Sequence, residues 1–67
     1  GSMSLDIEEK DGEIHIYNLF EGGGGLIRCR VDGVIELYEI PSYGGEERYS
    51  GVHPTIQSAI NESRTWT

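Results

Sequence analysis

Apolar and polar residues alternate with a period of two along much of the chain. This spacing is typical of β-strands that bury one face. It occurs in residues 5–9 and 14–20. Residues 26–31 are an apolar, β-branched run and residues 34–40 follow as a fourth strand, while residues 46–52 are the candidate for a short fifth strand. Asp-Gly pairs, which favour tight hairpin turns, follow the first and third segments. The pattern therefore predicts an antiparallel sheet built from hairpins.

Helical spacing replaces this alternation near the end of the chain. Thr55 is a suitable N-cap, and apolar residues then recur on one helical stripe. The sequence predicts an α+β fold, an antiparallel β-meander of four to five strands with one C-terminal helix packed on one face through Ile56, Ala59, Ile60 and Trp66. We expect residues 5–67 to form this single domain and residues 1–4 to be a tag remnant and disordered start.

The two Asp-Gly turns also predict a strand register. Two-residue turns at Asp11-Gly12 and Asp32-Gly33 give the opposed pairs Ile7–Ile16 and Cys29–Glu36. If the glycine segment 22–25 then places Ile16 opposite Val31, one face collects a coherent core of Leu5, Ile7, Ile14, Ile16, Phe20, Ile27, Cys29, Val31, Val34, Tyr38 and Ile40. A connection shifted by one residue would instead set Arg28 and Arg30 among the isoleucines, where unpaired charges are costly.

The opposite face of this predicted sheet is mixed in character. It carries Asp6, Glu8, His15, Tyr17, Leu19, Arg28, Arg30, Ile35, Leu37 and Glu39. Ile35 and Leu37 would be uncovered there beside Tyr17, which suggests an apolar contact surface.

Composition narrows the classes of function. The chain has 67 residues, one cysteine and a formal net charge of −7. A single cysteine cannot form an intrachain disulfide, so a reducing cytoplasm is expected, and no apolar run is long enough to cross a membrane. Net negative charge opposes direct binding of nucleic acid or an anionic membrane. Basic protein surfaces are the expected partners, bound by a monomer or a weak homodimer.

Motifs for catalysis or cofactors are weak. The glycines at 22–25 lack the lysine and following helix of a phosphate loop, and Glu21 would repel phosphate. Cys29 and His15 fall on opposite faces of the predicted sheet, so they are not expected to form a nucleophile and base. The histidines and the cysteine lack zinc-ligand spacing. We therefore predict a protein that is not an enzyme, with no cofactor, no metal site and no catalytic residue.

Acidic residues are the most informative chemical feature. On a rigid sheet, spaced carboxylates can occupy the positions that DNA phosphates take in a basic groove. The predicted partner-binding residues are Glu8, Glu9, Asp11, Glu13, Glu36, Glu39, Glu46 and Glu47. The alternative interpretation is that these charges only solvate the wet face of a sheet.

The acidic cluster at residues 8–13, the sheet with its Asp-Gly turns and the helix beginning at Thr55 resemble small acidic phage-encoded anti-CRISPR proteins that mimic DNA. The resemblance implies an inhibitor that blocks the DNA-binding surface of a defence complex, such as a subunit of a CRISPR surveillance complex, in the host cytoplasm. Arg28 and Arg30 depart from it, because they interrupt a purely negative face. The alternative function is an accessory interaction or oligomerisation module that uses the apolar strand face around Tyr17, Ile35 and Leu37.

Overall fold

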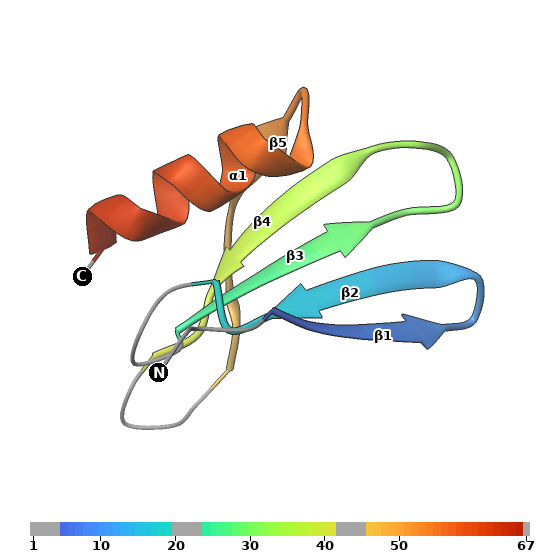
Figure 1. Cartoon of the computed structure of the whole chain (residues 1–67), viewed down its shortest axis with the longest axis horizontal. Helices are drawn as coiled ribbons and strands as arrows, with labels where there is room; N and C mark the ends of the chain where they lie inside the picture. Colours follow the sequence, from blue (N-terminus) through green and yellow to red (C-terminus); the bar gives the residue numbers. More distant parts are fainter. Residues whose placement is uncertain (1–4, 20–23, 42–45, 67) are drawn as a thin grey trace.

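A computed structural model describes residues 5–19, 24–41 and 46–66. Its five strands are β1 (Asp6–Lys10), β2 (Glu13–Tyr17), β3 (Gly25–Cys29), β4 (Ile35–Glu39) and β5 (Arg48–His53). They form one antiparallel sheet in the order β1-β2-β3-β4-β5, followed by helix α1 (Ile56–Ser63) and a 3-10 turn (Arg64–Trp66) (Figure 1). The predicted α+β meander with one C-terminal helix is confirmed. The expected tag remnant at 1–4 lies outside the described residues.

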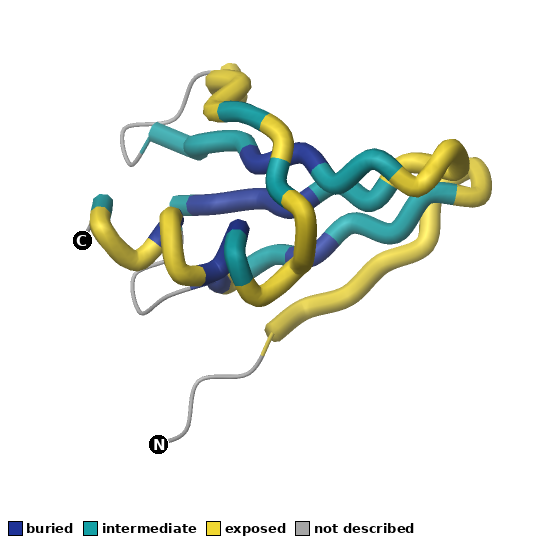
Figure 2. Tube along the Cα trace, turned by 90° about the horizontal axis from the view of Figure 1, so that it is seen from above, coloured by how far each residue is buried: buried dark blue, intermediate teal, exposed yellow. Residues whose placement is uncertain are grey.

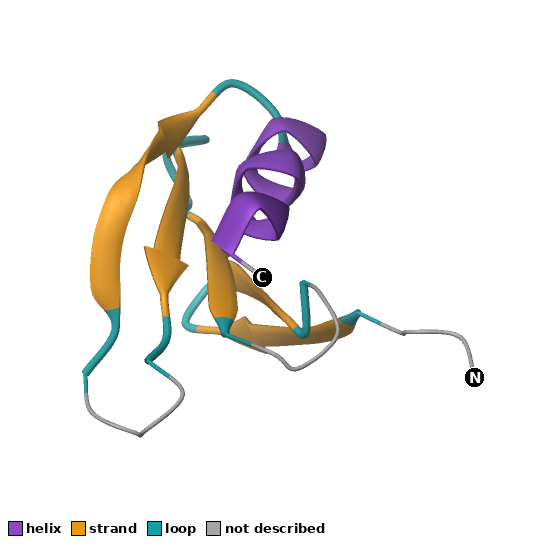
Figure 3. Cartoon of the chain, turned by 90° about the vertical axis from the view of Figure 1, so that its left-hand side faces the viewer, coloured by secondary structure: helices purple, strands orange, loops and turns teal. Residues whose placement is uncertain are grey.

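Helix α1 begins as its sequence predicts. The Oγ1 atom of Thr55 accepts a hydrogen bond from the backbone N–H of Ser58 at 3.0 Å, which satisfies one of the free amides of the first turn. The helix packs over β3, β4 and β5 on one side of the sheet (Figure 3). Ala59 and Ile60 are buried and Trp66 packs against the core, whereas Ile56 remains 38% exposed.

The core lies between α1 and the sheet (Figure 2). It contains Ile16, Leu19, Ile27, Leu37, Ala59 and Ile60, with Ile14, Cys29, Ile35 and Trp66 packed around it. Because α1 covers β3 to β5, edge strand β1 extends beyond the helix. Its Ile7 is 64% exposed and Leu5 is 43% exposed, so the prediction that both belong to the core is wrong.

The first Asp-Gly turn forms as predicted. Lys10 pairs with Glu13 and Ile7 pairs with Ile16 across β1 and β2. Asp11 and Gly12, between the strands, have φ values of 52° and 83°, as a type I′ turn requires.

The second Asp-Gly turn differs from the prediction and changes the register of β4. The backbone N–H of Arg30 donates a hydrogen bond to the carbonyl of Val34, and the carbonyl of Arg30 accepts one from the N–H of Gly33. The residues between them, Val31, Asp32 and Gly33, therefore form a three-residue loop. Gly33 takes the left-handed φ of 91° that such a loop needs. Cys29 therefore lies opposite Ile35 rather than Glu36.

This shift by one residue reverses the two faces of β4. Ile35 and Leu37 face the helix, and Leu37 is fully buried, whereas Tyr38 lies on the other side. The predicted apolar contact surface around Tyr17, Ile35 and Leu37 is thus wrong, since two of its members belong to the core. Val31, predicted to face Ile16, is 75% exposed in the loop, and Ile16 lies opposite Ile27.

Leu19 is a second departure from simple alternation. Asn18 has a φ of 58°, and this left-handed residue turns the chain after β2. Leu19 is then fully buried, although alternation predicted it on the opposite face. A Cβ atom on Gly25 would lie only 2.8 Å from Leu19 Cδ1, which is too close. This contact explains why a glycine occupies this buried position. Phe20, the next predicted core residue, lies outside the described residues.

Candidate functional site

The side of the sheet away from α1, here called the open face, is covered by no described helix or strand. The registers place two cross-strand rows on it. The charged row is Glu8, His15, Arg28, Glu36 and Val52, and the tyrosine row is Asp6, Tyr17, Leu26, Tyr38 and Tyr49. Neighbours within a row are close enough to interact directly.

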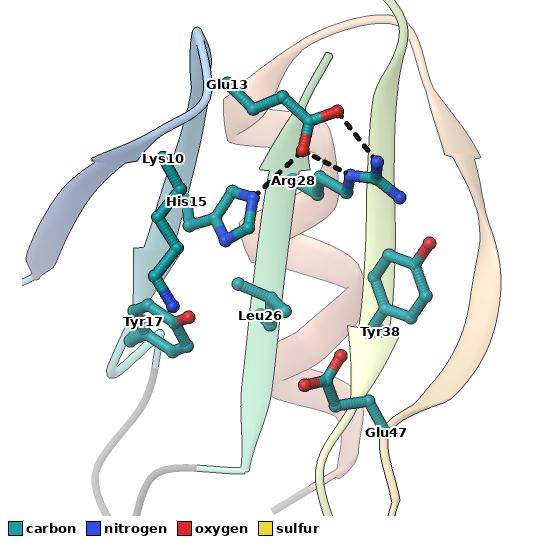
Figure 4. Close-up of a pocket in the computed structure, with 8 residues that line it drawn as sticks. All are labelled: Lys10, Glu13, His15, Tyr17, Leu26, Arg28, Tyr38 and Glu47. Atoms are coloured by element: carbon teal, nitrogen blue, oxygen red, sulfur yellow. Dashed lines mark hydrogen bonds and ion pairs between the residues drawn. The ribbon is translucent and has the colours of Figure 1, made fainter.

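Arg28 holds the charged row together. Its Nε and Nη2 atoms donate to the two carboxylate oxygens of Glu13 at 2.8 and 2.7 Å, a bidentate pairing (Figure 4). Its Nη1 atom lies 3.6 Å from Glu36. Arg30 approaches the same Glu36 at 3.5 Å, and the hydroxyl of Tyr38 donates to it at 3.0 Å. Glu36 is only 8% exposed, and these contacts satisfy its carboxylate.

The ion pairs also shift the pKa values of Glu13 and Arg28 on the open face. The hydrogen bonds from Arg28, and then from His15, lower the pKa of Glu13 from 4.5 to about 2. The same Glu13 carboxylate raises the pKa of Arg28 above its ordinary value. Both groups are therefore fully charged at neutral pH, and the guanidinium of Arg28 is occupied by its intramolecular partners.

The eight predicted partner-binding carboxylates divide into two groups. Four form ion pairs inside the chain: Glu13 and Glu36 with Arg28, Glu39 with Arg48 at 3.4 Å, and Glu8 with Lys10 at 3.9 Å. The other four form no ion pair within the described part of the chain: Glu9, Asp11, Glu46 and Glu47.

The unpaired carboxylates do not form one continuous patch. Glu9 and Asp11 lie at the β1–β2 turn, whereas Glu46 and Glu47 precede β5, whose first residue pairs with the far end of β4. The two pairs therefore occupy opposite ends of the sheet (Figure 1). The fold therefore separates these four carboxylates into two groups.

A depression of about 260 Å³ opens on the open face. It extends across the sheet, with a lining of Lys10, Glu13, His15, Tyr17, Leu26, Arg28, Tyr38 and Glu47 (Figure 4). Leu26 lies between Tyr17 and Tyr38 in the register and is only 3% exposed although no helix covers it.

The tyrosine row was not found by sequence reasoning, because the wrong register of β4 placed Tyr38 in the core. The sequence nevertheless contains a signal for the observed register of β4. The predicted register put Glu36 opposite Cys29 on the core face, whereas a shift of one residue brings Glu36 opposite Arg28. Burial of an unpaired carboxylate is costly, and opposite charges on neighbouring strands attract, so both terms favour the observed register.

The cysteine and the two histidines, the side chains considered for catalysis, lie in different places in the fold. Cys29 packs against the core, where desolvation raises the pKa of its thiol, and His15 lies on the open face with its ring nitrogen 3.2 Å from Glu13. His53 Nδ1 lies 3.0 Å from Ser58 Oγ, a hydrogen bond that joins the end of β5 to α1. Among the described residues, no group of three or more histidine, cysteine or acidic side chains is arranged to hold a metal ion.

Within the described ranges, no helix has both the length and the apolar composition needed to cross a bilayer. The chain gives no significant match to a protein-family model, to a curated protein or to a solved structure. The function proposed below therefore rests on the residues of the two sheet faces and not on a related protein.

Proposed function

We propose that this protein is a non-catalytic binding domain that docks on a basic surface of a partner protein and competes there with nucleic acid. The observation that carries the proposal is the distribution of ion pairs. Lys10, Arg28, Arg30 and Arg48 each form an ion pair with a carboxylate of the same chain. Among the described residues, Glu9, Asp11, Glu46 and Glu47 form no ion pair, and these carboxylates are available to a basic partner.

The rigidity of the scaffold supports this proposal. Glu9 lies in strand β1, and Asp11 is held in the two-residue turn between β1 and β2. Carboxylates on such elements lose little conformational entropy when they meet a basic surface, so more of the electrostatic attraction is available for binding. In its more specific form, the proposal is that the partner is a nucleic-acid-binding defence complex in the host cytoplasm, as the resemblance to phage-encoded anti-CRISPR proteins implies.

The test is affinity capture from a host lysate with the immobilised protein at 0.1 M and 1 M salt. The Debye length falls from about 10 Å to about 3 Å over this range, so a partner held by the carboxylates should be lost at high salt and displaced by duplex DNA. A variant with Glu9→Gln, Asp11→Asn, Glu46→Gln and Glu47→Gln should fail to capture it. Glu62→Gln, which removes one charge from the exposed side of α1, is the control and should capture normally. A partner that is retained at 1 M salt by the four-residue variant would disprove the proposal.

Edge strand β1 favours a second candidate, a protein-interaction module that pairs through its edge. All five residues of β1 are exposed, and no described element covers Ile7 on the helix side of the sheet. Edge strands with free backbone groups can add another strand. If this candidate is correct, Ile7→Lys should abolish an association that sedimentation velocity detects in the unmodified protein and that persists at 1 M salt. A monomer at all concentrations would remove self-pairing from consideration.

A further inference from the structure

The depression on the open face has a chemically asymmetric lining. Its floor is the buried Leu26, and the rings of Tyr17 and Tyr38 flank this floor in the tyrosine row (Figure 4). Tyr38 is held in place by its hydrogen bond to Glu36 and by an edge-to-face contact with Tyr49, with ring centroids 5.6 Å apart and planes at 65°. The aromatic wall on this side is therefore pre-organised.

The charges around the depression differ in their availability. Arg28 is engaged by Glu13 and Glu36, and Lys10 lies 3.9 Å from Glu8. Glu47, in contrast, lines the depression without an ion pair among the described residues, and Figure 4 shows its carboxylate below Tyr38, turned toward the side on which Leu26 lies. An incoming group thus meets an apolar floor, two tyrosine rings and one carboxylate that is free to bind a cation.

We infer that this depression receives an arginine side chain of the partner, an inference that rests on the proposed function and names the group recognised. A guanidinium stacks on tyrosine faces and pairs with a carboxylate, while its aliphatic stem suits the Leu26 floor. A volume of about 260 Å³ is just below the range of roughly 300–1,000 Å³ typical of pockets for free small molecules, which favours one side chain projecting from a macromolecule. Arginine fits better than lysine, because the planar guanidinium stacks on the rings, whereas an ammonium contacts them only as a compact point charge.

The inference is tested by titrating Nα-acetyl-arginine amide into the ¹⁵N-labelled protein and following its amide NMR signals. Saturable shifts are expected at Tyr17, Leu26 and Tyr38. Nα-acetyl-citrulline amide has nearly the same shape without the charge, and it should bind several-fold more weakly. Glu47→Gln should weaken arginine binding about three- to fivefold, the range expected for one exposed charge-assisted contact. Glu62→Gln is the matched control and should leave binding unchanged.

Replacement of Lys10 tests the inference through a gain in affinity, which a variant that fails to fold would not show. Its ammonium borders the same depression and repels a bound guanidinium, so Lys10→Gln should strengthen arginine binding about twofold. Equal affinities for the arginine and citrulline derivatives, or unchanged affinity in Glu47→Gln, would overturn the inference.

The two proposals fail in distinguishable ways. If the arginine derivative does not shift the tyrosine row while a salt-sensitive, DNA-displaced partner is still lost in the four-residue variant, the proposed function stands and the arginine pocket is wrong. If the derivative binds as expected but the captured partner is indifferent to salt and DNA, the pocket stands and the proposed function is wrong.

Discussion

Replacing Leu37 by alanine is expected to destabilise the protein strongly, whereas the same replacement at Val31 should have little effect. Leu37 is fully buried at the centre of the sheet, and Val31 is 75% exposed in the loop before β4. A buried leucine truncated to alanine typically costs about 3 kcal/mol, the sum of lost hydrophobic transfer and an incompletely filled cavity. An exposed truncation costs less than about 0.5 kcal/mol.

The comparison is informative because the two possible registers of β4 predict opposite results. With a two-residue turn at Asp32-Gly33, Val31 would be in the core and Leu37 in solvent. A chain of this length is stabilised by roughly 3–10 kcal/mol in total, so a loss of about 3 kcal/mol is readily measured. Urea unfolding followed by far-UV circular dichroism and by the fluorescence of Trp66, which packs against the core, gives both free energies of unfolding. A larger loss for Val31→Ala than for Leu37→Ala would refute the three-residue loop and the open face derived from it.

Three further predictions concern the helix cap, acid stability and the thiol. Thr55→Ala should lower the free energy of unfolding by about 1 kcal/mol in urea titration, because Ser58 N–H loses its acceptor, and an unchanged midpoint would argue against the cap. The folded-state pKa of Glu13 is about 2 against 4.5 when unpaired, so its pairing with Arg28 stabilises the fold fully above pH 4.5, and this contribution is lost as the pH falls toward 2. Glu13→Gln should therefore unfold with a weaker pH dependence between pH 4.5 and 2, and parallel curves for both proteins would contradict the assignment. Cys29 should react slowly with a disulfide reagent at pH 7, since burial raises the pKa of its thiol, and the rate should increase in urea; equal rates in the two conditions would show that the thiol is not protected.

Local sequence determined most of the secondary structure. Alternation and apolar, β-branched runs predicted a meander of four to five strands, Asp11-Gly12 set the first hairpin register, and Thr55 fixed the start of α1. Each of these signals acts over a few neighbouring residues: a strand alternates its side chains, a type I′ turn needs positive φ at two positions, and a helix needs a side-chain acceptor at its N-terminus.

Tertiary structure decided which face of β4 is buried. Residues 34–40 are apolar on both faces, and an Asp-Gly pair accommodates either a two-residue turn or the longer loop that ends with Gly33 in the left-handed conformation. The observed register satisfies two distant requirements together. It places Leu37 beneath α1, and it brings Glu36 beside Arg28, where its charge is compensated.

The candidate site was also determined partly by the sequence and partly by the tertiary structure. Sequence alone identified the acidic residues, and four of them remain unpaired among the described residues. It did not show that Glu13 and Glu36 neutralise Arg28, nor that Tyr17, Leu26 and Tyr38 form one row beside Glu47. These relations depend on which strands lie side by side and in what register, and both are set by the burial of apolar area beneath a helix that lies far along the chain.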